Sequence, residues 1–216
     1  MKVAPSLLAA DFSRLEEEIR KVEAAGADLL HLDVMDGSFV PTLTFGPMVV
    51  EAIKKMTKLP VNAHLMILHP EKFVNDFINT GADIITFHIE SADDANFLIK
   101  RIKGQDRKVG IALNPDTGFY RVTHHLYQID VLLLMSVFPG FGGQGFMPEV
   151  LPKVREASEW ITKHKFKCEI EVDGGVNQDS AKELLEAGCD VVVAGTAIFK
   201  KENYQEAITA LRCSKV

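Results

Sequence analysis

The stretches Ala24-Ala25-Gly26-Ala27-Asp28, Asn79-Thr80-Gly81-Ala82-Asp83 and Glu186-Ala187-Gly188-Cys189-Asp190 repeat one pattern along this chain. In each of them an amphipathic segment ends at a glycine, and a run of apolar residues follows. Glycine just after the last helical turn is typical of a helix C-terminus, because it takes the left-handed backbone conformation without strain. The repeat therefore predicts helix-to-strand junctions in a protein built from βα units.

Short β-branched or leucine-rich runs alternate with longer amphipathic segments throughout the chain. We expect strands at residues 2–6, 28–34, 61–66, 83–88, 108–113, 130–136, 167–172 and 190–194. We expect helices at residues 14–25, capped by Ser13, and at 47–55, 71–79, 92–103, 148–163, 179–187 and 203–211, whereas the connection around 120–126 has the weakest helical pattern. Eight such units without a GxGxxG after the first strand favour a single (β/α)8 TIM barrel domain over residues 1–216, rather than a doubly wound sheet.

Composition narrows the classes of function. The chain has 216 residues, 47% hydrophobic and 25% charged, which is enough for one core. Its formal net charge of -6 argues against nucleic-acid binding, which needs clustered positive charge. No apolar run approaches the roughly 20 residues of a membrane helix, and no charged leader precedes one at the start. Cys168, Cys189 and Cys213 are widely spaced, so we expect reduced thiols in a cytoplasmic protein.

Polar side chains gather where the expected strands end. In His31-Leu32-Asp33 the imidazole and the carboxylate share one face of a strand, and His64 and Asp173 end two other strands. The carboxyl ends of the strands meet at one rim of a (β/α)8 barrel, where the chemistry of such barrels is found. Two imidazoles and two carboxylates suit a borderline divalent ion, with Zn²⁺, Fe²⁺, Mn²⁺ and Co²⁺ fitting about equally. The sequence thus predicts one divalent metal site.

Other residues of these types allow either two interpretations or only a structural one. His88 could be a substrate neighbour or a hydrogen-bonded strand residue, and Glu171 could support a metal ligand or make a structural ion pair. We expect solvent exposure for the histidines in helices and loops, His69, His124, His125 and His164. The lysines expected in or beside strands fall at strand beginnings, away from the rim, which argues against a lysine-dependent aldolase: Lys2, Lys108 and Lys167.

Methionines and glycines complete the expected rim. Met35, Met66 and Met135 end three strands, where they could pack against an apolar intermediate or simply fill the core. Glycine-rich loops follow the last three strands, at 138–144, 174–175 and 194–196. Tight turns would explain any one of these loops. Three together favour close backbone approach to a phosphate, which an acidic protein could bind through N–H groups.

The chain resembles the ribulose-phosphate 3-epimerase family over essentially its whole length. Nine motifs in order carry the resemblance: Ala4-Pro5-Ser6, His31-Leu32-Asp33-Val34-Met35-Asp36-Gly37, His64-Leu65-Met66, Ile85-Thr86-Phe87-His88, Leu113-Asn114-Pro115, Met135-Ser136-Val137, Pro139-Gly140-Phe141-Gly142-Gly143-Gln144, Glu171-Val172-Asp173-Gly174-Gly175 and Ala194-Gly195-Thr196-Ala197-Ile198-Phe199. The resemblance implies a barrel of the ribulose-phosphate-binding type. It also implies a homo-oligomeric isomerase of the pentose phosphate pathway that interconverts D-ribulose 5-phosphate and D-xylulose 5-phosphate.

The resemblance also assigns roles to residues. Those matching His31, Asp33, His64 and Asp173 would bind one catalytic divalent ion, and the two aspartates would serve as acid and base. Ser6 and His64 would contact the substrate. The three methionines would cover the reacting carbon, and the residues around the sugar and its phosphate would be Gly140, Phe141, Gly142, Gly143, Gly174, Gly175, Gly195 and Thr196.

Three positions depart from the family pattern, and they keep other functions open. Ser38, Thr42 and Phe138 stand where that family commonly has other residues, so a 3-epimerase for a hexulose 6-phosphate such as D-allulose 6-phosphate is the alternative. A non-catalytic sugar-phosphate sensor ranks lower, because a sensor has no need of two opposed carboxylates. Orotidine-phosphate-decarboxylase-like barrels use an Asp-x-Lys-x-x-Asp segment. Met35 replaces that lysine here, which disfavours decarboxylation.

Overall fold

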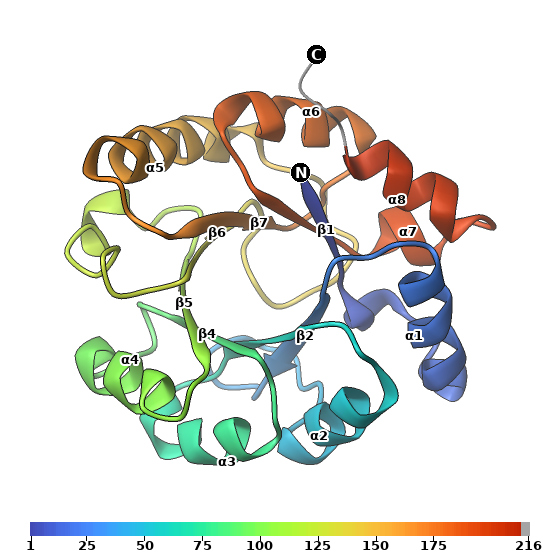
Figure 1. The fold of residues 1–216 in the computed structure, drawn as a ribbon, viewed down its shortest axis with the longest axis horizontal. Coiled ribbons are helices and arrows are strands. Elements are labelled where there is room, and N and C mark those ends of the chain that lie inside the picture. Colours follow the sequence, from blue (N-terminus) through green and yellow to red (C-terminus); the bar gives the residue numbers. More distant parts are fainter. Residues whose placement is uncertain (213–216) are drawn as a thin grey trace.

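A parallel barrel forms the centre of the molecule in this computed structural model, which describes residues 1–212 (Figure 1). The strands are β1 (Lys2–Pro5), β2 (Leu30–Met35), β3 (Val61–Met66), β4 (Ile84–His88), β5 (Lys108–Leu113), β6 (Val131–Met135), β7 (Glu169–Asp173) and β8 (Val191–Ala194). Each strand from β2 to β7 pairs in parallel with the next in the chain, β8 pairs with β1, and a bridge between Ser6 and His31 completes the ring. The expected (β/α)8 barrel is confirmed; Cys213 lies outside the described residues.

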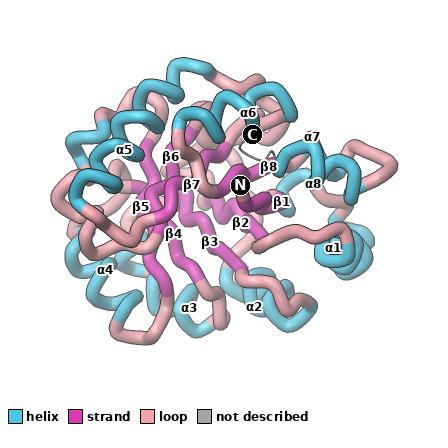
Figure 2. The backbone as a smooth tube through the Cα atoms, turned by 45° about the horizontal axis from the view of Figure 1, so that its top comes forward, coloured by secondary structure: helices cyan, strands magenta, loops and turns pink. Residues whose placement is uncertain are grey.

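Helices form an outer layer around the strands (Figure 2). They are α1 (Leu15–Ala24), α2 (Pro47–Met56), α3 (Val74–Asn79), α4 (Ala95–Lys103), α5 (Leu151–His164), α6 (Gln178–Ala187), α7 (Thr196–Phe199) and α8 (Tyr204–Arg212). The weak fifth connection contains only a 3-10 turn, Phe119–Arg121. The short helix α7 was not expected. No helix within residues 1–212 is both long and apolar enough to cross a membrane.

The expected Ser13 cap of the first helix is wrong. Asp11 accepts the Ser13 N–H instead and caps a 3-10 turn, Phe12–Arg14, that precedes α1. The helix proper then begins at Leu15 without a side-chain cap. Asp11 and Ser13 both favour such positions, and the aspartate two residues earlier takes the role because its carboxylate accepts from both the Ser13 N–H and hydroxyl.

The repeated glycine–aspartate junctions have a clear structural role. Their glycines Gly26, Gly81 and Gly188 take positive φ angles of 87°, 85° and 97°. The aspartate that follows each glycine accepts a backbone N–H from the start of the preceding strand: Asp28 from Val3, Asp83 from Val61 and Asp190 from Ile170, at 2.8–2.9 Å. Asp130 does the same for Val109. Each of these aspartates stands just before one strand and binds the preceding strand. The two strands are thereby linked at the amino-terminal end of the barrel.

Alternate residues of each strand point to opposite sides of the barrel wall, either toward the helices or into the barrel. On β2, Leu30, Leu32 and Val34 belong to the apolar layer between strands and helices, together with helix residues such as Ile19 and Ile53. The opposite face points into the barrel. A cluster of apolar side chains fills part of this inner space: Ala4, Leu29, Ile84, Val131, Val191 and Val193. Polar side chains share this interior: Asn62 is the second residue of β3, whereas Asp33 and Asp173 lie toward the carboxyl ends of β2 and β7.

Candidate metal centre

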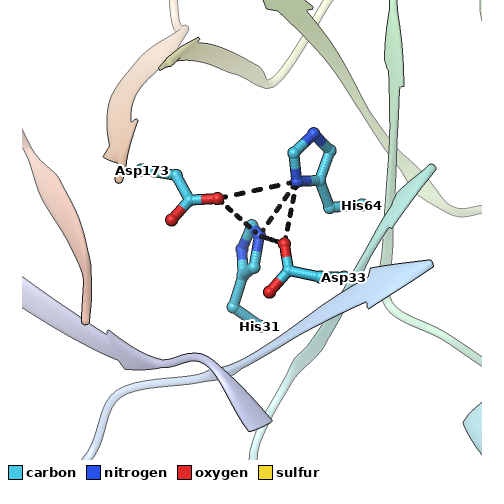
Figure 3. A group of neighbouring side chains, drawn as sticks. All are labelled: His31, Asp33, His64 and Asp173. Carbon is cyan, nitrogen blue, oxygen red and sulfur yellow. Dashed lines mark hydrogen bonds and ion pairs between the residues drawn. The ribbon is translucent and has the colours of Figure 1, made fainter. Parts of the chain in front are cut away.

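Four side chains converge at the carboxyl-terminal end of the barrel: His31 and Asp33 from β2, His64 from β3 and Asp173 from β7 (Figure 3). The His31 Nε2 atom lies 3.1 Å from His64 Nδ1, 3.2 Å from Asp33 Oδ1 and 3.5 Å from Asp173 Oδ2. His64 Nδ1 lies 3.3 Å from Asp33 Oδ1 and 3.7 Å from Asp173 Oδ2. One donor atom from each residue therefore points at a common centre.

These separations fit a bound divalent ion. Ligand atoms at about 2.1 Å from an ion stand about 3.0 Å apart on an octahedral edge and about 3.4 Å apart on a tetrahedral edge. The five distances span 3.1–3.7 Å, and the four donor atoms all lie within 4.8 Å of one another. Two imidazole nitrogens and two carboxylate oxygens are also the donor types that Zn²⁺ and similar ions accept. The chain's own geometry and donor chemistry thus suit a metal ion.

Buried neighbours hold this cluster in place. The Ser6 hydroxyl donates to Asp33 Oδ2 at 2.6 Å, across the seam where the barrel closes. His31 Nδ1 lies 2.8 Å from Glu171 Oε1, so the ring is oriented with Nε2 toward the centre. Glu171 also accepts from the Asn62 amide at 3.3 Å. Of the two readings of Glu171, a contact with a candidate ligand is the one that the geometry shows.

Gly110 leaves space for the side chains of Asn62 and Thr86, which lie below the candidate ligands. The Asn62 Oδ1 atom accepts from the Thr86 hydroxyl at 2.9 Å, and a Cβ on Gly110 would lie 2.3 Å from that hydroxyl oxygen. A side chain at this inward position of β5 would therefore displace Thr86 and, through it, Asn62. Asn62 and Thr86 were not predicted as part of the site. Strand parity could have found them, because each lies two residues before a histidine on the same strand face.

The second imidazole is supported from the adjacent strand. His64 Nε2 lies 2.9 Å from His88 Nε2, and His88 Nδ1 lies 3.2 Å from Glu90 Oε2. All three histidine rings are fully buried. His88 is therefore a hydrogen-bonded neighbour of a candidate ligand, and it is absent from the cavity lining of the described residues. Glu90 was missed by the sequence analysis, although it follows His88 with the parity of the inward face.

The pKa values of the two aspartates are shifted in opposite directions. Burial opposes ionisation of Asp33, but His31 and His64 outweigh it and lower its pKa. Burial and the negative charge of Asp33 raise the pKa of Asp173 to about 8. Burial lowers the pKa of His64 to about 3, whereas the carboxylates around His31 overcome its burial and raise its pKa well above the usual value. Near neutral pH, in the absence of a metal, Asp33 is ionised and Asp173 holds a proton.

A cavity opens directly above the candidate centre, and the two aspartates lie in its wall. Its wall contains every other residue predicted for substrate or intermediate contact, apart from the buried His64: Ser6, Met35, Met66, Met135, Gly140, Phe141, Gly142, Gly143, Gly174, Gly175, Gly195 and Thr196. Val137, Pro139, Gln144 and Val176 also line it and were not predicted. The described lining residues include no lysine or arginine. An anion in this cavity would therefore be bound by neutral donors such as backbone N–H groups.

Two of the cavity glycines are required by contacts within the chain itself. A Cβ on Gly174, where φ is +122°, would lie 2.5 Å from the Val137 side chain. A Cβ on Gly175, where φ is +64°, would lie 2.4 Å from the Phe146 nitrogen. The loops after β6 and β7 thus pack backbone against backbone. This close packing accounts for Gly174-Gly175 without a ligand, so these glycines alone do not identify a phosphate site.

Most other histidine and lysine expectations fit the structure, with one error. His124 and His164 are exposed and His69 is partly exposed beside Asp93, but His125 is 3% exposed. The expectation of a solvated His125 is wrong, because this residue is buried together with Val122 and Leu126 of the same turn-rich connection. Lys2 pairs with Glu169 at the start of β1, away from the cavity. Ser38, Thr42 and Phe138, the departures from the family pattern, are also absent from the described cavity lining.

The chain is similar in sequence to proteins of one known family. The model of the ribulose-phosphate 3 epimerase family matches residues 2–199. Proteins named ribulose-phosphate 3-epimerase are 48% identical in Synechocystis, over 99% of this chain and 94% of the relative, and 45% identical in Bacillus subtilis, over 100% of both. The chloroplastic ribulose-5-phosphate-3-epimerase of Arabidopsis thaliana is 42% identical over 99% of this chain and 76% of the relative.

Solved structures share the fold at low sequence identity. A 3-hexulose-6-phosphate synthase from Salmonella typhimurium superposes with a TM-score of 0.71 at 19% identity, covering 98% of this chain and 96% of that one. Orotidine 5'-phosphate decarboxylase from Pyrococcus horikoshii superposes with a TM-score of 0.68 at 15% identity, covering 98% and 97%. At these identities the likeness concerns the barrel alone.

Proposed function

The chain belongs to the ribulose-phosphate 3-epimerase family, and we propose that its barrel is a single catalytic domain that epimerises D-ribulose 5-phosphate to D-xylulose 5-phosphate at C3. One observation carries this proposal: Asp33 and Asp173 line one cavity from strands β2 and β7, and two buried imidazoles lie beside them. Epimerisation removes a proton next to a carbonyl from one face and returns one to the other. Two carboxylates are needed because neither can reach both faces.

The two aspartates would divide the two proton transfers between them, because they reach the cavity from different strands, β2 and β7. Asp33 is held ionised, so it accepts the C3 proton of ribulose 5-phosphate, and an enediolate forms. Asp173 would donate a proton from the opposite face. In the metal-free protein, burial and the charge of Asp33 raise its pKa to about 8. The product is xylulose 5-phosphate. In the reverse direction the two side chains exchange roles.

His31, Asp33, His64 and Asp173 would hold the divalent ion. When bound, such an ion stabilises negative charge that develops on the oxygens next to the reacting carbon. Zn²⁺, Fe²⁺, Mn²⁺ and Co²⁺ all accept these donors. Met35, Met66 and Met135 line the cavity on three strands and would exclude water from the intermediate. Ser6, which donates to Asp33, and the buried His64 would complete the substrate contacts.

The phosphate would lie against the loops after β6, β7 and β8. Residues 140–143, Gly174, Gly175, Gly195 and Thr196 contribute backbone to this wall of the cavity. Replacing Gly175 with Ala is expected to raise the KM for ribulose 5-phosphate about tenfold to a hundredfold, the value of a hydrogen bond to a charged group. The reason is that its Cβ would push the neighbouring loop backbone away. Steady-state kinetics measures the change.

A matched control for this variant is Gly26→Ala. Gly26 has a similar positive φ of +87°, but nothing lies within 4 Å of its Cβ position, and it precedes β2 at the opposite end of the barrel. Both substitutions introduce the same kind of backbone strain. If the two variants show equal KM values, the loop after β7 does not bind the substrate phosphate.

The substrate is identified by proton exchange. Metal-loaded protein is incubated in deuterated water with ribulose 5-phosphate or allulose 6-phosphate, and NMR follows deuterium at C3. We expect rapid exchange with the pentulose phosphate, because the positions that depart from the family pattern are absent from the described cavity lining. Faster exchange with the hexulose phosphate would reverse the substrate assignment. Absence of exchange with both would leave a sugar-phosphate sensor.

We also propose a cytoplasmic homo-oligomer. Cys168 and Cys189 are free and buried, and burial raises the pKa of Cys168 to about 12, which suits a reducing compartment. Leu43 and Met48, near the start of α2, expose 75% and 83% of their surface. Apolar side chains exposed to this extent fit contacts between subunits. Light scattering in solution tests the oligomer, and a monomer would contradict it.

A further inference from the structure

The candidate metal ligand His64 is bonded on its far side to a second histidine. Its Nδ1 atom faces the centre, and its Nε2 atom lies 2.9 Å from His88 Nε2. The planes of the two rings are nearly parallel, with an interplanar angle of 22°. Phe39 packs on His88 with ring centroids 4.9 Å apart. His88 is fully buried and is therefore held in one orientation.

A carboxylate ends this chain of contacts. His88 Nδ1 lies 3.2 Å from Glu90 Oε2, and the Asn114 N–H donates to Glu90 Oε1 at 2.8 Å. Lys153 fixes the loop that carries this N–H, because its ammonium group donates to the Asn114 and Pro115 carbonyls at 2.9 and 2.8 Å. The Glu90 side chain is only 18% exposed. Burial opposes its ionisation, but the hydrogen bonds from His88, Thr117 and Asn114 lower its pKa.

The donors and acceptors along these hydrogen bonds allow one arrangement of protons when His88 is neutral. The Asn114 N–H is a fixed donor, so Glu90 must accept there, and its other oxygen is a charged acceptor facing His88 Nδ1. The His88 proton therefore lies on Nδ1, which leaves His88 Nε2 as an acceptor. His64 then carries its proton on Nε2. Its Nδ1 lone pair is free and points at the centre.

We infer that Glu90, acting through His88, is a positioning residue that holds His64 in the tautomer required of a metal ligand. The inference rests on the proposed metal centre. It adds a second carboxylate-supported imidazole to that centre, because His31 is held directly by Glu171. Neither His88 nor Glu90 is among the described residues that line the cavity, so they act without contacting the substrate.

A Glu90→Gln substitution tests this arrangement because a glutamine of the same shape cannot accept at both ends. If its oxygen faces the Asn114 N–H, its amide group donates to His88 Nδ1. His88 then protonates Nε2, and His64 must move its proton to Nδ1, the atom that faces the metal. If its oxygen faces His88 instead, two donors oppose each other at Asn114. Both outcomes weaken metal binding.

The experiment measures the dissociation constant of Zn²⁺ or Co²⁺ by competition with a chromophoric chelator. We expect Glu90→Gln to weaken binding about tenfold to a hundredfold. The matched control is Asp93→Asn, which alters an exposed histidine–carboxylate pair, His69–Asp93, outside the centre. A Glu90→Gln constant equal to that of the control would overturn the inference while leaving the proposed epimerase intact. A wild-type protein that binds no metal would overturn both.

Two further measurements separate positioning from a general loss of structure. In a double-mutant cycle, Glu90→Gln should have no added effect on metal affinity in a His88→Gln background, because its effect passes through His88. Additive effects would contradict this route. In the zinc-loaded wild type, nitrogen-15 NMR of the imidazoles should show hydrogen on His64 Nε2 and on His88 Nδ1. Hydrogen on His88 Nε2 with none on Nδ1 would refute the inference without any variant.

Discussion

Replacing Asp173 with Asn is expected to reduce epimerisation of ribulose 5-phosphate by about a thousandfold or more. A positioned general acid or base contributes about 10² to 10⁴ in rate, and Asp173 also faces the candidate metal centre. The amide cannot deliver a proton to the face opposite Asp33. Turnover followed by NMR in deuterated water measures the loss at C3. Asp33→Asn should be as damaging, because this carboxylate is the proposed proton acceptor.

The Asp33→Asn and Asp173→Asn variants are expected to differ in metal binding. Asp33 approaches both imidazoles, at 3.2 and 3.3 Å, and accepts from Ser6, so its loss should also weaken metal binding. Asp173 is farther from both rings, at 3.5 and 3.7 Å. Both carboxylates are candidate ligands. Metal occupancy is therefore measured in each variant, and rates are compared for metal-loaded protein. The exposed Asp93→Asn variant serves as the control. Epimerisation at the wild-type rate in metal-loaded Asp33→Asn and Asp173→Asn would refute the two-aspartate mechanism.

Strand parity made much of the site predictable from the sequence. His31 and Asp33 stand two residues apart in an apolar run, so they share the inner face of β2, and the barrel then brings His64 and Asp173 to the same rim. The glycine–aspartate repeat located the strand beginnings for a physical reason. Each aspartate binds the N–H of the preceding strand, so its position is fixed by the barrel.

Contacts between distant segments were not predictable in the same way. Glu90 lies beyond β4, and only the fold shows that the Asn114 N–H from the next unit holds it against His88. The glycines of the loop after β7 could be read as a ligand signal, but the backbone of residues 137 and 144–146 already requires them. His125 sits in a segment of weak helical pattern. Its burial depends on tertiary packing that no local pattern records.

Removing the metal with a chelator is expected to abolish epimerisation, and adding back a divalent ion should restore it. The four donor atoms around the centre belong to buried or nearly buried side chains, and a bound ion would stabilise the negative charge that develops next to the reacting carbon. The apolar layers of the barrel do not include these residues, so the chelated protein should remain folded. Circular dichroism provides that control. Full activity after the removal of all bound metal would contradict a metal-dependent reaction.

The same site predicts proton release when the metal binds. In the metal-free protein near neutral pH, His31 is protonated between Asp33, Glu171 and Asp173, and Asp173 holds a proton because burial and Asp33 raise its pKa to about 8. A metal needs both donor atoms unprotonated, so its affinity should rise with pH, by up to about tenfold per unit for each proton displaced. The part due to Asp173 should level off above about pH 8. Titration calorimetry in two buffers with different ionisation enthalpies counts the protons, and binding without proton release below pH 8 would show that Asp173 is already ionised.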